Sequence, residues 1–264
     1  MKKGCFVEML MLLLLAANFV TAGWTIEIIG EVKLAALEED WPRVAELCSD
    51  ESQLKGYPVL RLILGHAFLA LNRNDESLEL FTSIKEADDI SALEAWSTAL
   101  LEEHPDNPMA LYFRGDAQAR AGDWESAASF YSESIEASKK AQRDNPLAHN
   151  ARGVARVFLG DLGGALEDFE SAGTAKEDFA DAFANAGTML IIREAGKGAL
   201  DKYNLALEKS ESFALAHNGR GCARLGCSRK ENTMEDALHD FGIALKCLQT
   251  KDLAQDNITM LGRA

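Results

Sequence analysis

The sequence contains little cysteine, proline or positive charge, and each shortage excludes a class of protein. Its 264 residues include 5 Cys and 5 Pro, too few for a disulfide scaffold or a proline-rich linker. The 27 Lys and Arg are outnumbered by 42 Asp and Glu, which gives a formal net charge of −15. Phosphate backbones are bound by basic surfaces, so this balance argues against a nucleic acid as the main partner.

Long apolar runs are also lacking after Ala22, so we expect no membrane span in the rest of the chain. Hydrophobic residues make up 47% of the sequence and charged residues 26%. This composition is typical of a globular chain with enough apolar material for a sizeable core. The length is that of one large domain or two ordinary ones.

The segment from Met1 to Ala22 has the pattern of a secretory signal peptide. Lys2 and Lys3 precede a short apolar stretch from Met9 to Val20, and small residues follow up to Ala22. The stretch is shorter than the roughly 20 residues that a spanning helix needs. We expect cleavage after Ala22 and export, to the periplasm or cell envelope of a bacterium. An uncleaved leader would instead anchor the chain in a membrane, and a buried helix is the third interpretation.

A repeat with a period of about 34 residues, a length typical of stacked helix pairs, organises the chain beyond this leader. Glycines recur at nearly equal intervals, at Gly115, Gly153, Gly187 and Gly221. Each of the first three is followed at one fixed distance by an alanine, and an aromatic comes one helical turn after that alanine. These pairs are Ala127 and Tyr131, Ala165 and Phe169, and Ala199 and Tyr203, with Ala237 and Phe241 displaced by a short insertion after Gly221. Upstream, Gly65, Ser77 and Phe81 keep the same phase, and a degenerate copy contains Val32, Val44 and Cys48.

Each repeat predicts two helices joined by a short turn. Turns such as Gly122-Asp123 and Gly160-Asp161 end the first helix and cap the second, because Gly favours a helix C-terminus and Asp an N-terminus. The glycine and alanine allow the two helices to approach closely, and the aromatic fills the space between pairs. Neither helix of a pair can bury its apolar stripe alone, so we expect the pairs to stack.

This pattern resembles the tetratricopeptide repeat family over roughly residues 25 to 250. The Leu-Gly of the family motif stands at Leu64-Gly65, while Leu111, His149, Phe183 and His217 replace its bulky aromatic. The resemblance implies an all-α, right-handed solenoid of about six stacked antiparallel helix pairs. Ala92, Trp96 and Ala99 predict an additional helix in the longer interval before Pro105.

Four segments follow from this interpretation. Residues 1–22 are the signal peptide, and 23–107 contain degenerate repeats with the additional helix. Residues 108–251 form a regular array of four repeats. Residues 252–264 are either a helix that caps the stack or the beginning of a truncated repeat.

Two arginine pairs recur in equivalent places and have two interpretations. Arg152 and Arg156 lie one helical turn apart, as do Arg220 and Arg224, and Asp168 and Asp240 precede the aromatics of the same two repeats. One interpretation is a cationic ladder that captures a carboxylate or phosphate. The other is a salt bridge to the second helix, which is favoured because the repeat of Gly187 has Ala186 and Lys202 in place of both charges.

No motif for a cofactor, metal or catalytic centre is present. The sequence has no phosphate-binding glycine loop or nucleophile elbow, and no two histidines share the spacing of a helical zinc site. His149 and His217 occupy packing positions, with metal binding or acid–base work as the alternative. Cys48, Cys222, Cys227 and Cys247 are expected to be buried free thiols, with one disulfide as the alternative.

The first helix of each pair is expected to line the concave face, where solenoids bind extended or helical segments. The repeat phase places a mixed apolar and amide-bearing set of residues there. They are Tyr112, Phe113, Asp116, Asn150, Val154, Phe158, Asn185, Thr188 and Asn218, with Met109, Val157, Asp181, Ile191, Leu215 and Cys222 beside them. The alternative is that these side chains only fill the inside of a tight superhelix.

These patterns predict a non-catalytic scaffold that binds a segment of another protein, and the acidic surface favours a basic partner. No cofactor, metal or nucleic acid is implied. Two alternatives stay open at this point. One is an accessory enzyme or metal-binding factor that uses His149 and His217, and the other is a structural protein that self-associates through its end repeats.

Overall fold

The computed structural model describes residues 26–49, 54, 56–227 and 231–246. Its regular elements are helices, and none of the described residues forms a β-strand. The N-terminal half contains α2 (Ile26–Leu37), α3 (Trp41–Leu47), α4 (Pro58–Ala70), α5 (Asn74–Thr82), α6 (Ala87–Glu103), α7 (Pro108–Ala121) and α8 (Trp124–Lys140). The C-terminal half contains α9 (Pro146–Phe158), α10 (Leu162–Ala175), α11 (Ala180–Ile192), α12 (Gly196–Lys209), α13 (Ala214–Cys227) and α14 (Glu231–Ala244). The predicted signal peptide and the predicted terminal segment 252–264 lie outside the described residues.

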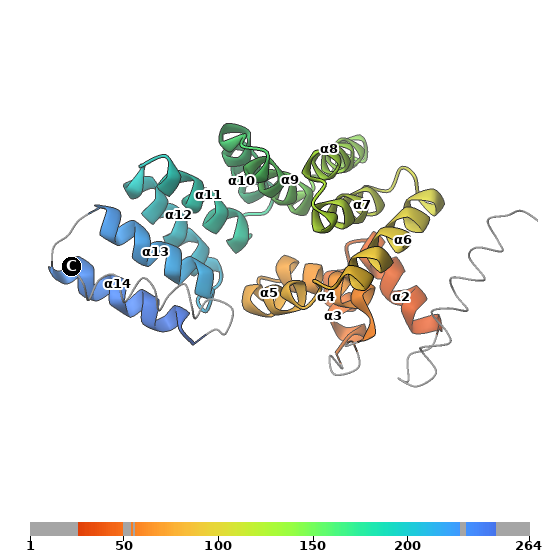
Figure 1. The fold of residues 1–264 in the computed structure, drawn as a ribbon, viewed down its shortest axis with the longest axis horizontal. Helices are drawn as coiled ribbons and strands as arrows, with labels where there is room; N and C mark the ends of the chain where they lie inside the picture. Colours follow the sequence, from red (N-terminus) through yellow and green to blue (C-terminus); the bar gives the residue numbers. More distant parts are fainter. Residues whose placement is uncertain (1–25, 50–53, 55, 228–230, 247–264) are drawn as a thin grey trace, which may run out of the picture.

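The helices form consecutive pairs that stack along the chain (Figure 1). The described pairs are α2 with α3, α4 with α5, α7 with α8, α9 with α10, α11 with α12, and α13 with α14. Helix α6 stands alone between the second and third pairs, where the sequence predicts an additional helix. The predicted all-α architecture of stacked helix pairs is therefore confirmed.

Side-chain caps decide where several of these helices begin. The Asn107 side chain accepts from the backbone N–H of Met109 at 2.8 Å, directly before Pro108 at the first helical position. Asn145 accepts from Ala148 N at 2.9 Å at the beginning of α9. Such caps satisfy backbone donors that have no partner within the helix. The repeated Asn-Pro motif is thus a repeated start signal for the first helix of a pair.

The recurring glycines lie directly against the recurring aromatics. A β-carbon added to Gly153 would lie 2.6 Å from Phe169 Cε1, and one added to Gly221 would lie 2.4 Å from Phe241 Cε1. Gly65 and Gly115 face Phe81 and Tyr131 in the same way. No β-carbon fits at such distances, so glycine is what lets the aromatic of the second helix lie against the first. This contact accounts for the recurrence of a glycine and an aromatic in successive pairs.

The stack curves, and its N-terminal part returns to its C-terminal part. Figure 1 shows α4 and α5 on the inside of the curve, opposite α11 and α13. The backbone carbonyl of Asn72, between α4 and α5, accepts from Ser210 Oγ at 3.2 Å. None of the described helices is both long and apolar enough to cross a membrane.

Candidate functional site

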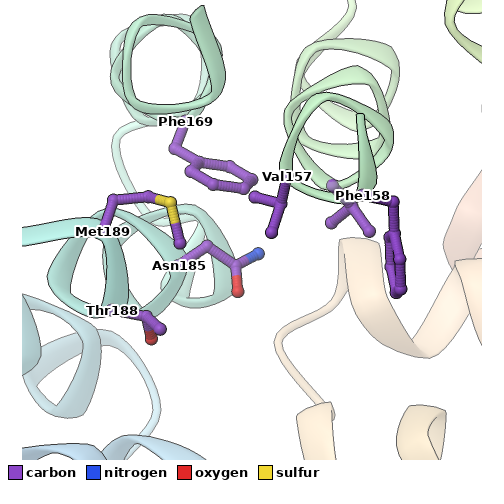
Figure 2. Close-up of a pocket in the computed structure, with 7 residues that line it drawn as sticks. Val157, Phe158, Phe169, Asn185, Thr188 and Met189 are labelled. Atoms are coloured by element: carbon purple, nitrogen blue, oxygen red, sulfur yellow. The ribbon is translucent and has the colours of Figure 1, made fainter. Parts of the chain in front are cut away.

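A cleft of about 180 Å³ lies between α9 and α11. Its walls are mainly apolar, with one amide and one hydroxyl among them (Figure 2). The lining residues are Val154, Val157, Phe158, Phe169, Asn185, Thr188 and Met189. We call this group the Phe158 cleft.

Helical spacing gathers these side chains on facing surfaces. Val154 and Phe158 are one turn apart on α9, and Asn185 and Met189 are one turn apart on α11, so each pair shares one face of its helix. Phe169 reaches the cleft from α10, where it also packs against Gly153. The aromatic that defines the repeat therefore forms part of the cleft as well as the core.

Phe158 is the most exposed large apolar side chain among the described residues. Its exposed fraction is 62%, and it stacks on Trp124 with ring centroids 3.9 Å apart and an angle of 2° between the planes. Trp124 begins α8 in the preceding pair, so the stack joins two repeats. In Figure 2, Phe158 points away from Phe169 and Met189, at the outer edge of the cleft. Together the two rings form an aromatic platform beside the cleft.

Two polar groups enter the cleft from α11, and both are held by neighbours. Asn185 Nδ2 donates to Asn150 Oδ1 at 2.9 Å, and this bond joins α11 to α9, the first helices of two neighbouring pairs. Thr188 Oγ1 lies 2.9 Å from the hydroxyl oxygen of Tyr203. A side-chain amide both donates and accepts, so Asn185 can use its remaining hydrogen-bonding groups for a backbone placed in the cleft.

Four predicted groove residues come together here: Val154, Phe158, Asn185 and Thr188. Asn150 adjoins them through its hydrogen bond to Asn185, but it is only 7% exposed and acts as a support. Asn218 lies on α13, beyond the residues that line the cleft. Val157 also lines the cleft, as the repeat phase predicts.

The prediction that side chains of α7, in the third pair, line an accessible groove was wrong. Met109, Tyr112 and Phe113 on α7 are 0%, 2% and 0% exposed, so they offer no surface to a partner. Helix α4 covers this face of α7, with His66 Nδ1 3.0 Å from the hydroxyl oxygen of Tyr112. The repeat phase predicts which face points inward but not that an earlier repeat covers it.

Asp116 belongs to the same covered interface. Its carboxylate accepts from Arg120 Nε at 2.9 Å, and His66 Nε2 lies 3.7 Å away. Burial opposes ionisation of this carboxyl, but Arg120 and His66 outweigh burial and hold the pKa of Asp116 well below its usual range. The arrangement ties α4 to α7 and makes Asp116 a structural residue.

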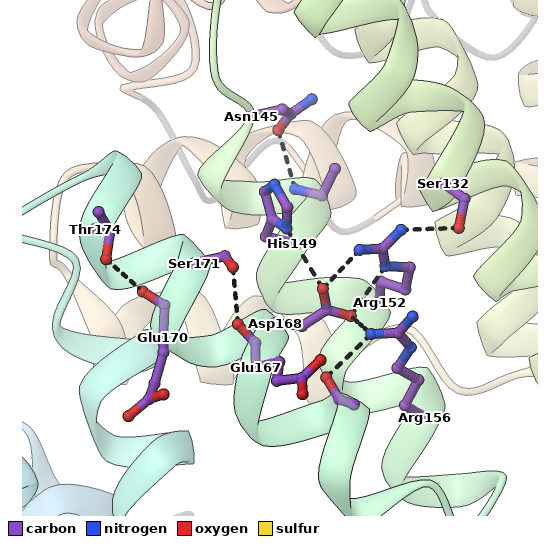
Figure 3. A network of polar contacts seen from close by, with 12 residues as sticks. Ser132, Asn145, His149, Arg152, Arg156, Glu167, Asp168, Glu170, Ser171 and Thr174 are labelled. Atoms are coloured by element: carbon purple, nitrogen blue, oxygen red, sulfur yellow. Dashed lines mark hydrogen bonds and ion pairs between the residues drawn. The ribbon is translucent and has the colours of Figure 1, made fainter.

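The two arginine pairs form salt bridges of equivalent geometry. Arg152 contacts both oxygens of Asp168, at 2.9 and 2.7 Å, and Arg156 Nη1 donates to the same carboxylate at 2.8 Å (Figure 3). Arg220 and Arg224 hold Asp240 in the same way, and Asp240 is fully buried. The structural interpretation is confirmed, because the guanidinium groups are already engaged within their own helix pairs.

Burial raises the pKa of Asp168, but hydrogen bonds from His149 and Arg152 and the charges of both arginines lower it by more, so the net shift is downward. The net shift of the Asp240 pKa is also downward, for the equivalent reasons. His149 Nδ1 lies 3.4 Å from Asp168, and His217 Nδ1 lies 3.1 Å from Asp240. Both histidines thus occupy packing positions beside a carboxylate.

No group of three or more His, Cys, Asp or Glu side chains is placed to hold a metal within the described ranges. Cys48, Cys222 and Cys227 form no disulfide with one another, and Cys247 lies outside those ranges. Cys48 is buried as predicted, and burial raises the pKa of its thiol to about 12. Cys227 is exposed, which contradicts its expected burial.

The comparisons with known proteins bear on the repeat and on the fold. A family model for the tetratricopeptide repeat matches residues 91–146, from α6 to the beginning of α9. This segment therefore carries tetratricopeptide repeats. No curated protein matches the sequence.

Solved structures share the architecture at low sequence identity. The APC/C hetero-tetramer Cut9-Hcn1 matches with a TM-score of 0.55 and 16% identity, over 94% of this chain and 45% of that chain. A crystal structure of MamA matches with a TM-score of 0.50 and 19% identity, over 62% of this chain and 92% of that chain. YrrB, a TPR protein with an unusual peptide-binding site, has a TM-score of 0.47 and 16% identity, over 79% of this chain and 97% of that chain. The first of these likenesses shows the fold, an all-α superhelix of the tetratricopeptide type.

Proposed function

We propose that this chain is a non-catalytic scaffold that binds a segment of another protein in the Phe158 cleft. The observation that carries the proposal is the aromatic platform, where Phe158 stays 62% exposed although Trp124 stacks on it. Exposing a large aromatic on a rigid helix costs solvation free energy, and such groups dominate the binding energy of protein interfaces.

The chemistry of the cleft suits a short apolar segment with an accessible backbone. Its apolar walls can take one or two side chains, and the Asn185 amide can hydrogen-bond a peptide group. The volume of about 180 Å³ is too small for a folded domain, so the partner would insert a side chain from an extended or helical segment. The net charge of −15 favours a basic partner and speeds its approach at low ionic strength.

Export to a bacterial cell envelope is part of this proposal and rests on the leader pattern that ends at Ala22. N-terminal sequencing of the protein recovered from cell fractions tests it. A mature chain that begins at Gly23 in the envelope fraction supports export. Retention of Met1 in the cytoplasm contradicts it.

Photo-crosslinking in the native cell tests the binding site. A photoreactive residue in place of Thr188, which is exposed beside the cleft, should capture a defined partner that Phe158→Asp no longer yields. Leu205→Asp is the matched control, because Leu205 is 37% exposed on α12 and does not line the cleft. Capture that survives Phe158→Asp, or that is lost equally in Leu205→Asp, would overturn the assignment.

A further inference from the structure

The turn between α4 and α5 binds the other end of the array. Asn72 Oδ1 accepts from the backbone N–H of Ala180 at 3.2 Å, and Asp75 Oδ1 accepts from the backbone N–H of Ala214 at 3.2 Å. Ser210 Oγ donates to the Asn72 carbonyl, and Lys176 donates to the carbonyl of Ala70. These contacts join positions that are 106 to 139 apart along the chain.

Two of these contacts are helix caps that come from a distant repeat. Ala180 and Ala214 are the first residues of α11 and α13, and the N-cap residue Phe179 provides no side-chain cap of its own. The first N–H groups of a helix need an acceptor, and asparagine and aspartate are preferred ones. Asn72 and Asp75 therefore take the role that Asn107 and Asn145 have within their own repeats.

Two carboxylic acids and one amide meet in this interface. Asn74 is 4% exposed and its side-chain nitrogen contacts Asp181, while its side-chain oxygen is buried without a hydrogen-bond partner among the described residues. Asp75 adds a second acidic group beside Asp181. An ionised Asp181 places a negative charge next to Asp75 inside this interface, and the nearby cation Lys176 is ion-paired with Asp178 instead, whereas a protonated Asp181 is neutral.

We propose that the α4–α5 turn, residues 70–75, is a latch that closes the superhelix at the N-termini of α11 and α13, and that this latch holds best when Asp181 is protonated. The inference does not depend on the proposed function. The latch also borders the Phe158 cleft, because Asp181 lies one helical turn before Asn185 on the same face of α11. Opening would extend the concave surface towards the beginning of α11.

The charges around Asp181 come from each element packed on it. Asp75 and Glu76 are on α5, and Glu76 forms an ion pair with Arg73. Lys176 lies just before α11 and forms an ion pair with Asp178. His217 on α13 lowers the pKa of Asp75, although burial raises that pKa more. Burial and Asp75 together raise the pKa of Asp181 to about 7, against the opposing effects of Asn74 and Lys176.

The direction of the pH dependence follows from this shift. An exposed aspartate has a pKa of about 3.9, so in the open form Asp181 ionises near pH 4 while in the closed form it keeps its proton to about pH 7. Closure is therefore weakened as pH rises from about 4 to about 7. The opening equilibrium constant should grow by up to about tenfold per pH unit in that window and level off above it.

Amide hydrogen exchange, corrected for the intrinsic pH dependence of exchange, tests the latch on the full-length protein. The Ala180 and Ala214 amides should lose protection from pH 5 to pH 7 and change little above pH 7. The Ala148 amide, capped by Asn145 within its own repeat, should keep its protection and report that the fold is intact. Asn72→Ala should expose Ala180 at every pH.

Asp181→Asn separates the latch from ordinary acid effects, because an amide keeps the contact with Asn74 but cannot ionise. Its Ala180 protection should be independent of pH, while the control Glu177→Gln, at an exposed acidic position before α11, should follow the wild type. A flat wild-type profile from pH 5 to pH 8 would overturn the proposal. So would an Asp181→Asn profile that falls as steeply as the wild type.

Discussion

At the scale of single residues, the carboxylates of Asp168 and Asp240 each hold two arginines and one histidine in place. Asp168 is 2% exposed, and its lowered pKa shows that the surrounding cations outweigh the cost of burial. Removing the anion takes away the carboxylate that Arg152 and Arg156 share, and leaves Arg156 with only Asp161 at 3.7 Å. Losing the partner of a buried charge costs more free energy of unfolding than losing a surface ion pair, which contributes little.

Asp168→Asn should therefore lower the free energy of unfolding at pH 7 by about 3 kcal/mol, measured by urea denaturation. A carboxyl with a lowered folded-state pKa stabilises the protein above about pH 4, and this contribution is lost as pH falls through the folded-state pKa. The difference between wild type and variant should accordingly shrink in acid. Glu136→Gln, which removes an exposed ion pair with Lys139, is the control and should cause no measurable change. Equal losses in the two variants would contradict this account.

At the scale of helices, the contact between glycine and aromatic sets how closely the two members of a pair approach. Gly153→Ala should destabilise the protein by about 1–3 kcal/mol, because the new β-carbon overlaps the Phe169 ring. Gly242→Ala in α14 is the matched control, since a β-carbon there meets nothing within 4 Å. It should be neutral or stabilising by up to about 1 kcal/mol through helix propensity. Thermal unfolding of both variants tests this prediction. If Gly153→Ala leaves the stability unchanged, the two helices of the pair can move apart without cost.

At the scale of the whole molecule, the latch changes how the array unfolds. In an open solenoid each repeat contacts only its neighbours, so stability is close to a sum of repeat and interface contributions. Here residues 70–75 link the second helix pair to the fifth and sixth. The N-terminal and C-terminal halves should therefore unfold together.

Removing the latch should separate the two halves. Asn72→Ala with Asp75→Ala should broaden the urea transition at pH 6 or split it into two steps, with a lower apparent m-value. Glu76→Gln is the control on α5, because Glu76 lies outside the latch and its ion pair with Arg73 is local. Fluorescence and circular dichroism recorded on the same samples should diverge in the double variant and coincide in the control. An unchanged single transition in the double variant would show that the halves are coupled elsewhere.

The sequence predicted the repeat, and with it the helix pairs and the additional helix, and it favoured the salt bridges over a cationic ladder. Each of these depends on residues of one repeat or of its immediate neighbour, where periodicity, caps and matched charges are visible. It also determined one wall of the candidate site, because Val154 and Phe158 on α9 follow from helical spacing.

What lies against the concave face became visible only once the whole stack was folded. Tyr112 and Phe113 have the pattern of groove residues, yet an earlier helix pair covers them. Likewise, Asn72 and Asp75 have the composition of an ordinary turn, but they cap two helices that begin 108 and 139 positions later. Local spacing predicts which way a side chain points. The accumulated curvature of the whole stack decides what that side chain meets, because small rotations between pairs add up over the entire chain.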